Sequence, residues 1–296
     1  MSQAWSISLR QPYGLQRVCR VWGTARSTVY FQRARRILKH VSRPRGPKPP
    51  ISDEKILSLA KEYFYQTPWK EEGHRKIYAW IKFVQGFKVG KDRVLRVLKA
   101  NQLLSPQRRP QGKVKAHDGC ITTDKPDVLW ATDGLRVRTL EEGWIWGFLA
   151  VDHHHGEILG VHSAKKGNTF AALQPISMGL MRIRSGVSKG VGQGISLRCD
   201  HGSQYISNMF TEQINDWGMN VSMAFVQEPQ TNGVAERAVR TLKEQIVYGR
   251  VIRNAEDLRQ KMIDYMNLYN STWRLEKNRY RTPNEVRQQL ALKQAA

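Results

Sequence analysis

The sequence predicts an α/β protein in which all-α helix-turn-helix units precede a mixed-sheet domain. Apolar residues recur at helical spacing up to about residue 100, and strand-like alternation begins near residue 128. From there, three strands in succession give way to alternating helices and strands, which is the order of an α/β layer fold. Two linkers are expected between the parts, a proline-rich basic one at 42–50 and a basic one at 105–118.

The charge of the chain points to a polyanionic partner. The 296 residues carry a formal net charge of +23, with 26 basic and 6 acidic side chains in residues 1–117 against 22 and 19 in residues 118–296. No membrane partner is expected, because the longest apolar run, 144–151, is too short to span a bilayer. The N-terminus lacks an apolar signal core, and three scattered cysteines exclude a disulfide framework and a cysteine-rich zinc module. These features predict a cytoplasmic protein that binds nucleic acid.

Residues 1–41 and 51–104 each read as helices around glycine turns. In 1–41, a helix-like stretch ends at Gly23 and a basic helix follows, so the segment predicts a helix-turn-helix-like unit. In 51–104, Ser52 is placed to cap the first of three helices, and Gly86 closes the second. The positions expected to face inward are Ile56, Leu59, Ala60, Tyr63 and Phe64 in the first helix, Ile77, Trp80, Ile81 and Val84 in the second, and Val94, Leu95 and Leu98 in the third.

Basic side chains are left on the outer faces of these helices. Arg93, Arg96 and Lys99 face away from the predicted core of the third helix, and Arg26 begins the basic helix of 1–41. A basic face is often no more than a solvated one, but two such units in the most basic part of the chain favour DNA binding through phosphate contacts.

Residues 119–250 carry the predicted sheet. Strands are expected at 128–140, 143–152, 157–163, 195–199 and 220–225, and helices at 168–182, 207–217 and from 232 onward. The run His153 to His155 resembles a metal tract, but a turn after the second strand explains it better, because successive side chains point in different directions. Residues 251–296 predict a C-terminal helical extension.

Three acidic residues are candidates for a functional site because of where they lie in the predicted strands and helices. Asp133 shares an apolar strand face with Ala131 and Leu135, which is costly unless its charge is offset. Asp200 ends the 195–199 strand, at the carboxyl side where functional groups collect in open α/β sheets. Glu236 lies early in a helix. Taken singly, each has an ordinary alternative: a carboxylate that reaches water, a helix cap, or an exposed ion pair.

The surrounding motifs make a stronger case. WATDGL (130–135), RCDHGSQY (198–205) and TNGVAERAVRTLK (231–243) resemble the three catalytic blocks of retroviral-integrase-like DDE transposases of bacterial insertion sequences, of the second-reading-frame type. The segment 73–104 resembles the helix-turn-helix that precedes the core in that group, and 269–283 its C-terminal block. One departure is that Trp273 and Leu275 stand where many relatives carry Arg and His, which puts contacts with the substrate end in doubt.

The resemblance implies an RNase H-like integrase core at 119–250. In it, Asp133, Asp200 and Glu236 would be the catalytic residues and would hold two Mg²⁺ ions, with Mn²⁺ as a substitute. An all-carboxylate site suits such ions. Strand cleavage by water and strand transfer by the resulting 3′-OH are the expected reactions. Lys243 and Arg240, on the face of Glu236, are expected to contact DNA, and Gln204 and Asn232 to orient the substrate or the metal ligands.

The implied partners are double-stranded DNA at element ends and at the target, and further copies of the chain assembled on DNA in the bacterial nucleoid. Two arrangements stay open: the chain acts alone, or it works with a partner or fusion from an upstream reading frame. Two alternative functions also stay open. One is a catalytically inactive DNA-binding regulator derived from a transposase; the other is an RNase H-like nuclease specific for particular nucleic-acid structures.

Overall fold

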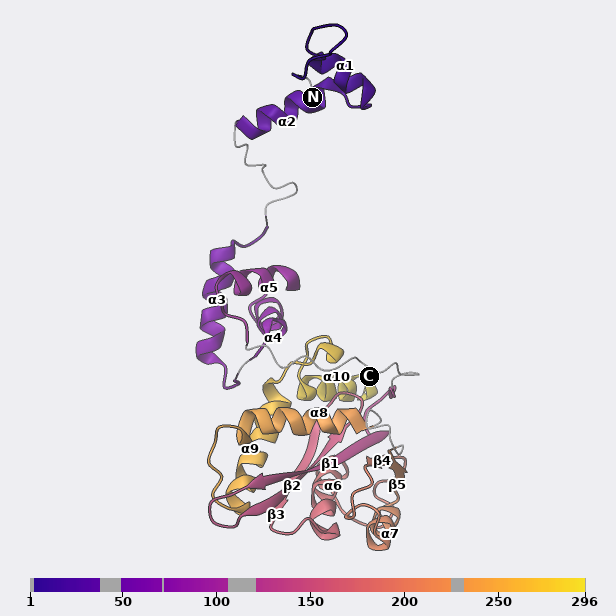
Figure 1. Ribbon diagram of the computed structural model, residues 1–296. Helices are drawn as coiled ribbons and strands as arrows, with labels where there is room; N and C mark the ends of the chain where they lie inside the picture. The colour runs from indigo at the N-terminus through magenta and orange to yellow at the C-terminus, as the bar shows by residue number, and fades with distance from the viewer. Residues whose placement is uncertain (1–2, 38–48, 71, 106–120, 225–231, 296) are drawn as a thin grey trace. The chain divides into compact units, whose positions relative to one another are not determined.

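The computed structural model describes residues 3–37, 49–70, 72–105, 121–224 and 232–295. The chain forms two compact units, Met1–Pro49 and Pro50–Ala296 (Figure 1). The predicted linkers 42–50 and 105–118 fall almost entirely outside the described residues. Within the described parts of the chain, no helix combines the length and apolar character needed to cross a membrane.

The first unit contains two short helices, α1 (Gly14–Val21) and α2 (Arg26–Ile37). They are joined at Gly23, whose φ of +59° is accessible to glycine at no steric penalty. Of its described side chains, only those of Ser6 and Cys19 are buried, whereas large apolar side chains are exposed: Trp5, Ile7, Leu9, Tyr13, Val21, Trp22, Tyr30 and Phe31. The segment thus contains a helix, a glycine turn and a basic helix, in the order that the sequence predicts.

The second unit begins with a three-helix segment. Its elements are α3 (Asp53–Gln66), α4 (His74–Ala79), which continues into the π-helical turn η1 (Trp80–Val84), and α5 (Lys91–Ala100). The predicted cap at Ser52 is confirmed, since its hydroxyl accepts a hydrogen bond of 3.2 Å from the backbone N–H of Lys55. The helices enclose a core centred on Ile56, Ile77 and Leu98, each of which is fully buried.

Three positions predicted to face inward do not. Phe64 is 37% exposed and Val84 is 49% exposed, while Leu95 is only partly buried and Val97 takes the inner place. Val84 lies at the end of η1, where the wider π turn changes the angular spacing of the side chains and carries this position away from the core. The prediction assumed 3.6 residues per turn throughout.

The rest of the second unit is built on a five-stranded mixed sheet in the order β3-β2-β1-β4-β5, which confirms the predicted α/β fold class and RNase H-like core. Strands β1 to β3 form an antiparallel meander, and β4 and β5 run parallel to β1. The strands are β1 (Leu129–Arg138), β2 (Trp144–Asp152), β3 (Ile158–Ala164), β4 (Ser196–Cys199) and β5 (Asn220–Met223).

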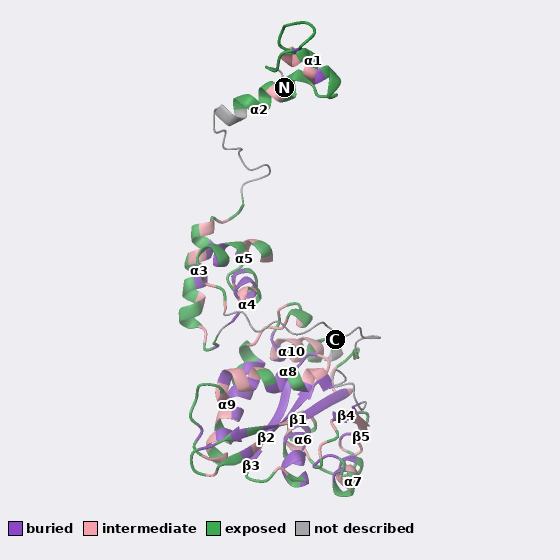
Figure 2. Ribbon diagram, in the orientation of Figure 1, coloured by how far each residue is buried: buried purple, intermediate pink, exposed green. Residues whose placement is uncertain are grey.

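Helices cover both faces of this sheet (Figure 1). One core, with Ala131 and Leu135 of β1, packs against α8 and α9; the other, with Trp130 and Phe148, packs against α6 and α7. The buried side chains of both cores concentrate on the sheet and on the inner faces of these helices (Figure 2). The helices are α6 (Thr169–Arg184), α7 (Asn208–Asp216), α8 (Gly233–Leu242), which continues into the π turn η3 (Lys243–Val247), and α9 (Ala255–Thr272).

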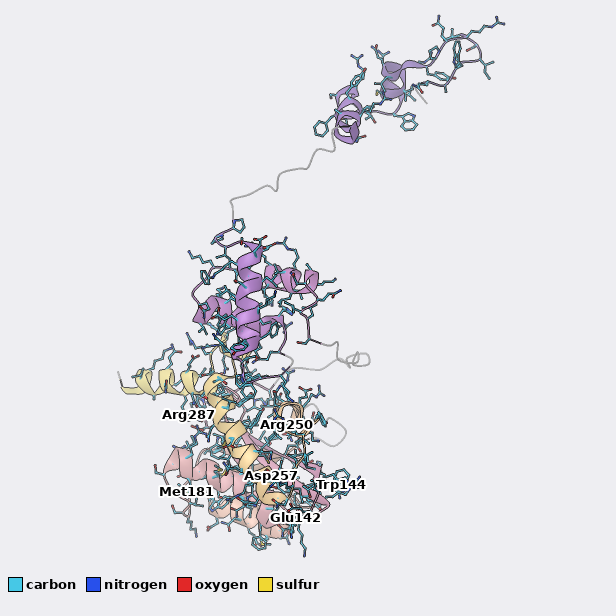
Figure 3. All side chains as sticks on the ribbon, turned by 90° about the vertical axis from the view of Figure 1, so that its left-hand side faces the viewer. Glu142, Trp144, Met181, Arg250, Asp257 and Arg287 are labelled. Atoms are coloured by element: carbon cyan, nitrogen blue, oxygen red, sulfur yellow. The ribbon has the colours of Figure 1, made fainter. Side chains whose placement is uncertain are left out.

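The C-terminal segment, residues 255–295, completes the second unit. After α9 come a 3₁₀ turn, η4 (Glu276–Asn278), and the helix α10 (Pro283–Ala295). The tip of the β1–β2 hairpin meets the start of α9, where the Glu142 carboxylate accepts a hydrogen bond of 2.8 Å from the backbone N–H of Ala255. Asp257, in the first turn of α9, accepts a hydrogen bond of 2.8 Å from the backbone N–H of Arg253; Glu142 and Asp257 are labelled in Figure 3.

Candidate active site

Strand pairing brings Asp133 and Asp200 to matching positions. Strands β1 and β4 are parallel, with Leu129 opposite Ser196 and Ala131 opposite Arg198. Continuing this register by two residues sets Asp133 opposite Asp200, on neighbouring strands that lie about 4.8 Å apart in a sheet.

The two carboxylates also share one face of the sheet. Side chains alternate along a strand, so Asp133 lies on the side of Ala131 and Leu135, in the core that α8 covers. On β4, Leu197 and Cys199 belong to the opposite core, which leaves Asp200 on the side of Asp133.

Helix α8 supplies Glu236 to this face. Its first residues are held against β1, because the side-chain amide of Asn232 donates a hydrogen bond of 3.2 Å to the carbonyl of Thr132, next to Asp133. Ala235 is fully buried in the core between α8 and the sheet, and Glu236, the next residue, is exposed at its margin. Three segments far apart in the sequence therefore meet at one place.

The charges of these side chains act on one another. Burial raises the pKa of Asp133 to about 6; the N–H of Gly134 opposes this shift, and the negative charges of Asp200 and Glu236 add to it. Burial likewise raises the pKa of Glu236, with Asp200 adding to the shift and Arg240 opposing it. Lys243 favours the ionised form of Asp133. The arrangement concentrates negative charge beside the middle of β1 and the end of β4.

Backbone amides hold the two aspartates. Asp133 Oδ1 accepts a hydrogen bond of 2.7 Å from its neighbour Gly134, and Asp200 Oδ1 accepts one of 3.0 Å from Gly202. A side chain at Gly202 would force Gln204 to shift, because a Cβ there would lie 2.4 Å from the Gln204 Nε2 atom and 3.0 Å from Asp200 Oδ1. Gln204, the predicted orienting residue, is buried in the same loop as Asp200, and its side-chain amide lies beside Gly202.

The donor set suits a hard divalent cation. Three carboxylates influence one another's charge here, and the Oδ1 atom of Asn232 is buried without a hydrogen-bond partner among the described residues. Oxygen donors of this kind are those that Mg²⁺ prefers. In the part of the chain that the structure describes, however, no group of three or more His, Cys, Asp or Glu side chains is already gathered around a common metal position.

The residues predicted to contact DNA lie in several places. Arg240 and Lys243 follow Glu236 along α8 and η3, and both influence the acidic site. Arg93 and Arg96 both pair with Asp53, at 2.6 and 3.0 Å, which leaves one positive charge in excess.

The other two predicted contacts are exposed on separate helices. Lys99 lies near the end of α5. Arg26 begins α2 in the first unit.

A second charged cluster, which sequence reasoning missed, is buried at the connection between β2 and β3. His155 lies in the predicted turn after β2, and its ring nitrogens meet the carboxylates of Asp152 at 2.8 Å and Glu157 at 2.9 Å. Burial opposes protonation of His155, but these carboxylates outweigh it and raise its pKa. Arg287 of α10, labelled in Figure 3, pairs with Glu157 and, at 2.9 Å, with Asp127. Every charge in the cluster has a partner within it, so the cluster joins α10 to the sheet.

The departures at Trp273 and Leu275 have structural consequences. The Trp273 ring lies 3.7 Å from the Lys76 ammonium and packs edge-on to Trp69, with ring centroids 4.9 Å apart. Leu275 packs over Gly156, where a Cβ would lie 3.1 Å from its side chain. In this chain the two positions join the three-helix segment and the turn after β2 to the C-terminal segment.

Comparisons with known proteins agree with this architecture. A family profile described as "Integrase core domain" matches residues 238–290. The transposase for insertion sequence element IS629 of Shigella sonnei is 23% identical over 288 residues, which cover 94% of this chain and 93% of that protein. Transposase InsD for insertion element IS2A/D/F/H/I/K of Escherichia coli is 23% identical over 181 residues, 59% of this chain and 60% of the relative.

Two solved structures give weaker matches. The simian T-cell lymphotropic virus intasome matches with 15% identity and a TM-score of 0.40, over 73% of this chain and 70% of that chain. The catalytic core domain of BIV integrase matches with 15% identity and a TM-score of 0.40, over 57% of this chain and 99% of that chain.

The sequence comparisons confirm the predicted class. The chain is similar to transposases of bacterial insertion sequences that contain an integrase core. Among these, the similarity to the IS629 transposase extends over nearly the whole of both chains.

Proposed function

We propose that this chain is a DNA transposase, which cuts DNA at the ends of an insertion sequence and joins them to a target through Asp133, Asp200 and Glu236. The observation that carries the proposal is the strand register. Extended two residues beyond the observed β1–β4 pairs, it puts the two aspartates opposite each other on one sheet face, under the helix that bears Glu236. The nearly full-length similarity to a transposase supports the same activity.

The three carboxylates would hold two Mg²⁺ or Mn²⁺ ions, with Asn232 Oδ1 as a further oxygen beside them. The chemistry that such a pair supplies when bound is activation of the attacking oxygen and stabilisation of the leaving oxygen. Ionised carboxylates repel one another, so we expect the side chains to stand apart without cations and to close when cations bind.

The protein's own groups prepare this site. The N–H groups of Gly134 and Gly202 fix one oxygen of each aspartate, which leaves the other free to act as a ligand. Lys243 and Arg240 add positive charge on the side of α8, where the phosphates of a cut end would need it. Gln204 supports the Asp200 loop from within the fold.

DNA affinity would come mainly from the basic helices. Lys99 and Arg26 are exposed, and the pair Arg93 and Arg96 retains one excess charge beside Asp53. Each phosphate contact adds sequence-independent affinity that weakens with salt. We therefore assign double-stranded DNA as the substrate and the nucleoid as the place of action.

An assembly of several chains on DNA fits the first unit. Its exposed aromatic side chains, such as Trp5 and Trp22, form a surface that another chain would cover. That chain would be a second copy or a partner encoded upstream. Comparing the oligomeric state with and without element-end DNA tests for a second copy. A chain that stays monomeric in both conditions points to the partner encoded upstream.

The test is a strand-cleavage and strand-transfer assay on element-end DNA. We expect wild-type protein to nick and join in Mg²⁺ and to do neither in EDTA. Asp133→Asn, Asp200→Asn and Glu236→Gln should each abolish both reactions while DNA binding persists. Asp216→Asn, an exposed carboxylate of α7, is the matched control and should behave as wild type.

Three results would contradict the proposal in different ways. Near-normal cleavage by any one of the three variants would show that the site is wrongly assigned. Binding without nicks in wild-type protein would favour the inactive regulator. Cleavage without joined products would favour a nuclease.

A further inference from the structure

An open groove of about 710 Å³ lies between the end of the three-helix segment and the C-terminal segment, away from the acidic site. Aromatic and charged side chains line it together: Tyr78, Lys82, Phe83, Arg274, Glu276, Arg279, Tyr280, Arg281 and Glu285. None of these residues was among the predicted DNA contacts.

The aromatic side chains form a small platform. The rings of Phe83 and Tyr280 are stacked, with centroids 5.6 Å apart and planes 25° from parallel. Tyr78 supports them edge-on, with its centroid 5.3 Å from that of Tyr280. Phe83 nevertheless keeps 47% of its surface exposed, so the platform is open to a flat apolar partner.

Positive charge surrounds the platform. Lys82 Nζ lies 5.2 Å from the centre of the Phe83 ring and makes no ion pair with the described carboxylates. Arg279 likewise has no ion pair or hydrogen bond of its side chain within the described residues, because the available carboxylates are already engaged: Glu285 by Arg274, and Glu276 by Arg75 and Lys91. Cations therefore outnumber carboxylates in and around the groove.

The backbone that presents Arg279 and Tyr280 is strained. Both residues have positive φ, 54° and 62°, a region that side-chain-bearing residues seldom adopt. The Leu275 carbonyl accepts a hydrogen bond from the Tyr280 N–H, and the Leu275 N–H donates one to the Arg281 carbonyl, which hold this loop closed at its base. Strain of this kind persists where surrounding structure enforces it, often at binding sites.

From these features we infer that the groove binds an unpaired nucleotide of the DNA substrate. The base would stack on Phe83 and Tyr280, and Lys82 and Arg279 would hold the adjoining phosphates. Proteins bind single strands by this combination of an aromatic platform and a basic groove. The inference rests on the proposed function in that it takes DNA as the ligand, and it adds a site for a frayed or single-stranded end.

Binding of full-length protein to fluorescent DNA in EDTA tests the inference without cleavage. The probes are a duplex with an unpaired thymine tail at one end and the same duplex with blunt ends. We expect wild-type protein to prefer the tailed duplex, and Phe83→Leu to weaken tailed binding about tenfold while leaving blunt binding unchanged. Lys82→Ala should weaken tailed binding and reduce its salt slope by about one.

Two exposed residues outside the groove provide matched controls. Tyr65→Leu removes a 93% exposed aromatic ring from α3, and Arg184→Ala removes an exposed cation from the end of α6. Both should leave the preference for the tail intact. Thermal unfolding midpoints equal to that of wild type show that the variants are folded.

Several outcomes would overturn the inference: unchanged tailed binding in both groove variants, or equal weakening of tailed and blunt binding. It is also overturned if polyglutamate binds wild-type protein more tightly than tailed DNA and loses that affinity in Phe83→Leu, since the groove would then be a peptide site. A wild-type protein that prefers the tail but never cleaves would refute the proposed function alone.

Discussion

Replacing Asp133 by Asn should make the metal-free protein more stable at neutral pH. Burial is the main reason that the pKa of Asp133 rises to about 6, and the charges of Asp200 and Glu236 add to the effect. A carboxyl group whose pKa is higher in the folded than in the unfolded state opposes folding once it ionises. Asparagine keeps the shape and can still accept the hydrogen bond from Gly134, but it carries no charge.

The size of the effect follows from the shift. A rise from 3.8 to about 6 is about 2 pH units. At about 1.4 kcal/mol per unit, ionised Asp133 lowers the free energy of unfolding by about 3 kcal/mol at most. Below about pH 4 both states are protonated, so the variant gains nothing. Between about pH 4 and pH 6 the unfolded state ionises while folded Asp133 stays protonated, so the wild type loses stability relative to the variant, and above pH 6 the difference is constant.

Thermal unfolding of both proteins between pH 4 and pH 8 in EDTA measures this difference. We expect the variant to melt roughly 6–12 °C higher at pH 7, with the gap closing toward pH 4. Asp216→Asn should follow wild type at every pH. Adding Mg²⁺ should raise the melting temperature of wild type more than that of the variant, because binding to the folded state stabilises it. Equal melting temperatures of wild type and Asp133→Asn at pH 7 in EDTA would refute the reasoning.

Three further substitutions test other parts of the structure. Arg287→Met should lower the free energy of unfolding by about 1–3 kcal/mol in denaturant titrations, because Glu157 and Asp127 lose a charged hydrogen-bond partner while Glu157 keeps Arg182 and His155, and an unchanged midpoint would count against the cluster. Gly202→Ala should reduce strand cleavage about 100-fold with DNA binding intact, since its Cβ would displace Gln204; full activity would show that the loop adjusts freely. Gly160→Ala places a Cβ 2.1 Å from a backbone carbonyl of α6 and should destabilise the fold by about 3 kcal/mol, which a wild-type melting curve would disprove.

Local signals were sufficient to predict most of the regular structure. The strand predicted at 143–152 is observed as Trp144–Asp152, and the helix at 168–182 as Thr169–Arg184. Ser52 caps α3 as its side-chain chemistry predicts. These elements depend on neighbours within a few residues, so the sequence around each one contains the information.

Departures occur at individual apolar positions of two helices. The predicted inner face of the second helix fails at Val84, because η1 widens the helix there. The third helix turns Val97 inward in place of Leu95. In both cases the residue type is apolar and compatible with either position, so hydrophobicity alone could not decide between them.

The buried cluster around His155 could not be predicted for a different reason. Asp152, His155 and Glu157 are neighbours in sequence, but the partner that balances them, Arg287, lies 130 residues after Glu157. Without that partner, two buried carboxylates look implausible and an exposed turn is the better prediction. Arg182 of α6 also pairs with Glu157, at 3.1 Å, so the balancing cations come from two helices whose docking only the tertiary structure shows.

The acidic site depends on tertiary structure in the same way, but here the sheet itself provides the link. Asp200 shares a face with Asp133 because Leu197 and Cys199 are committed to the opposite core. A slip of β4 by one residue would turn Asp200 away and expose those two apolar side chains, so the core that stabilises the strand also fixes its register. Three acidic side chains are thus held near one another by the burial of side chains that take no part in the chemistry. Mutations of Leu197 that loosen this packing should therefore reduce cleavage before they unfold the protein.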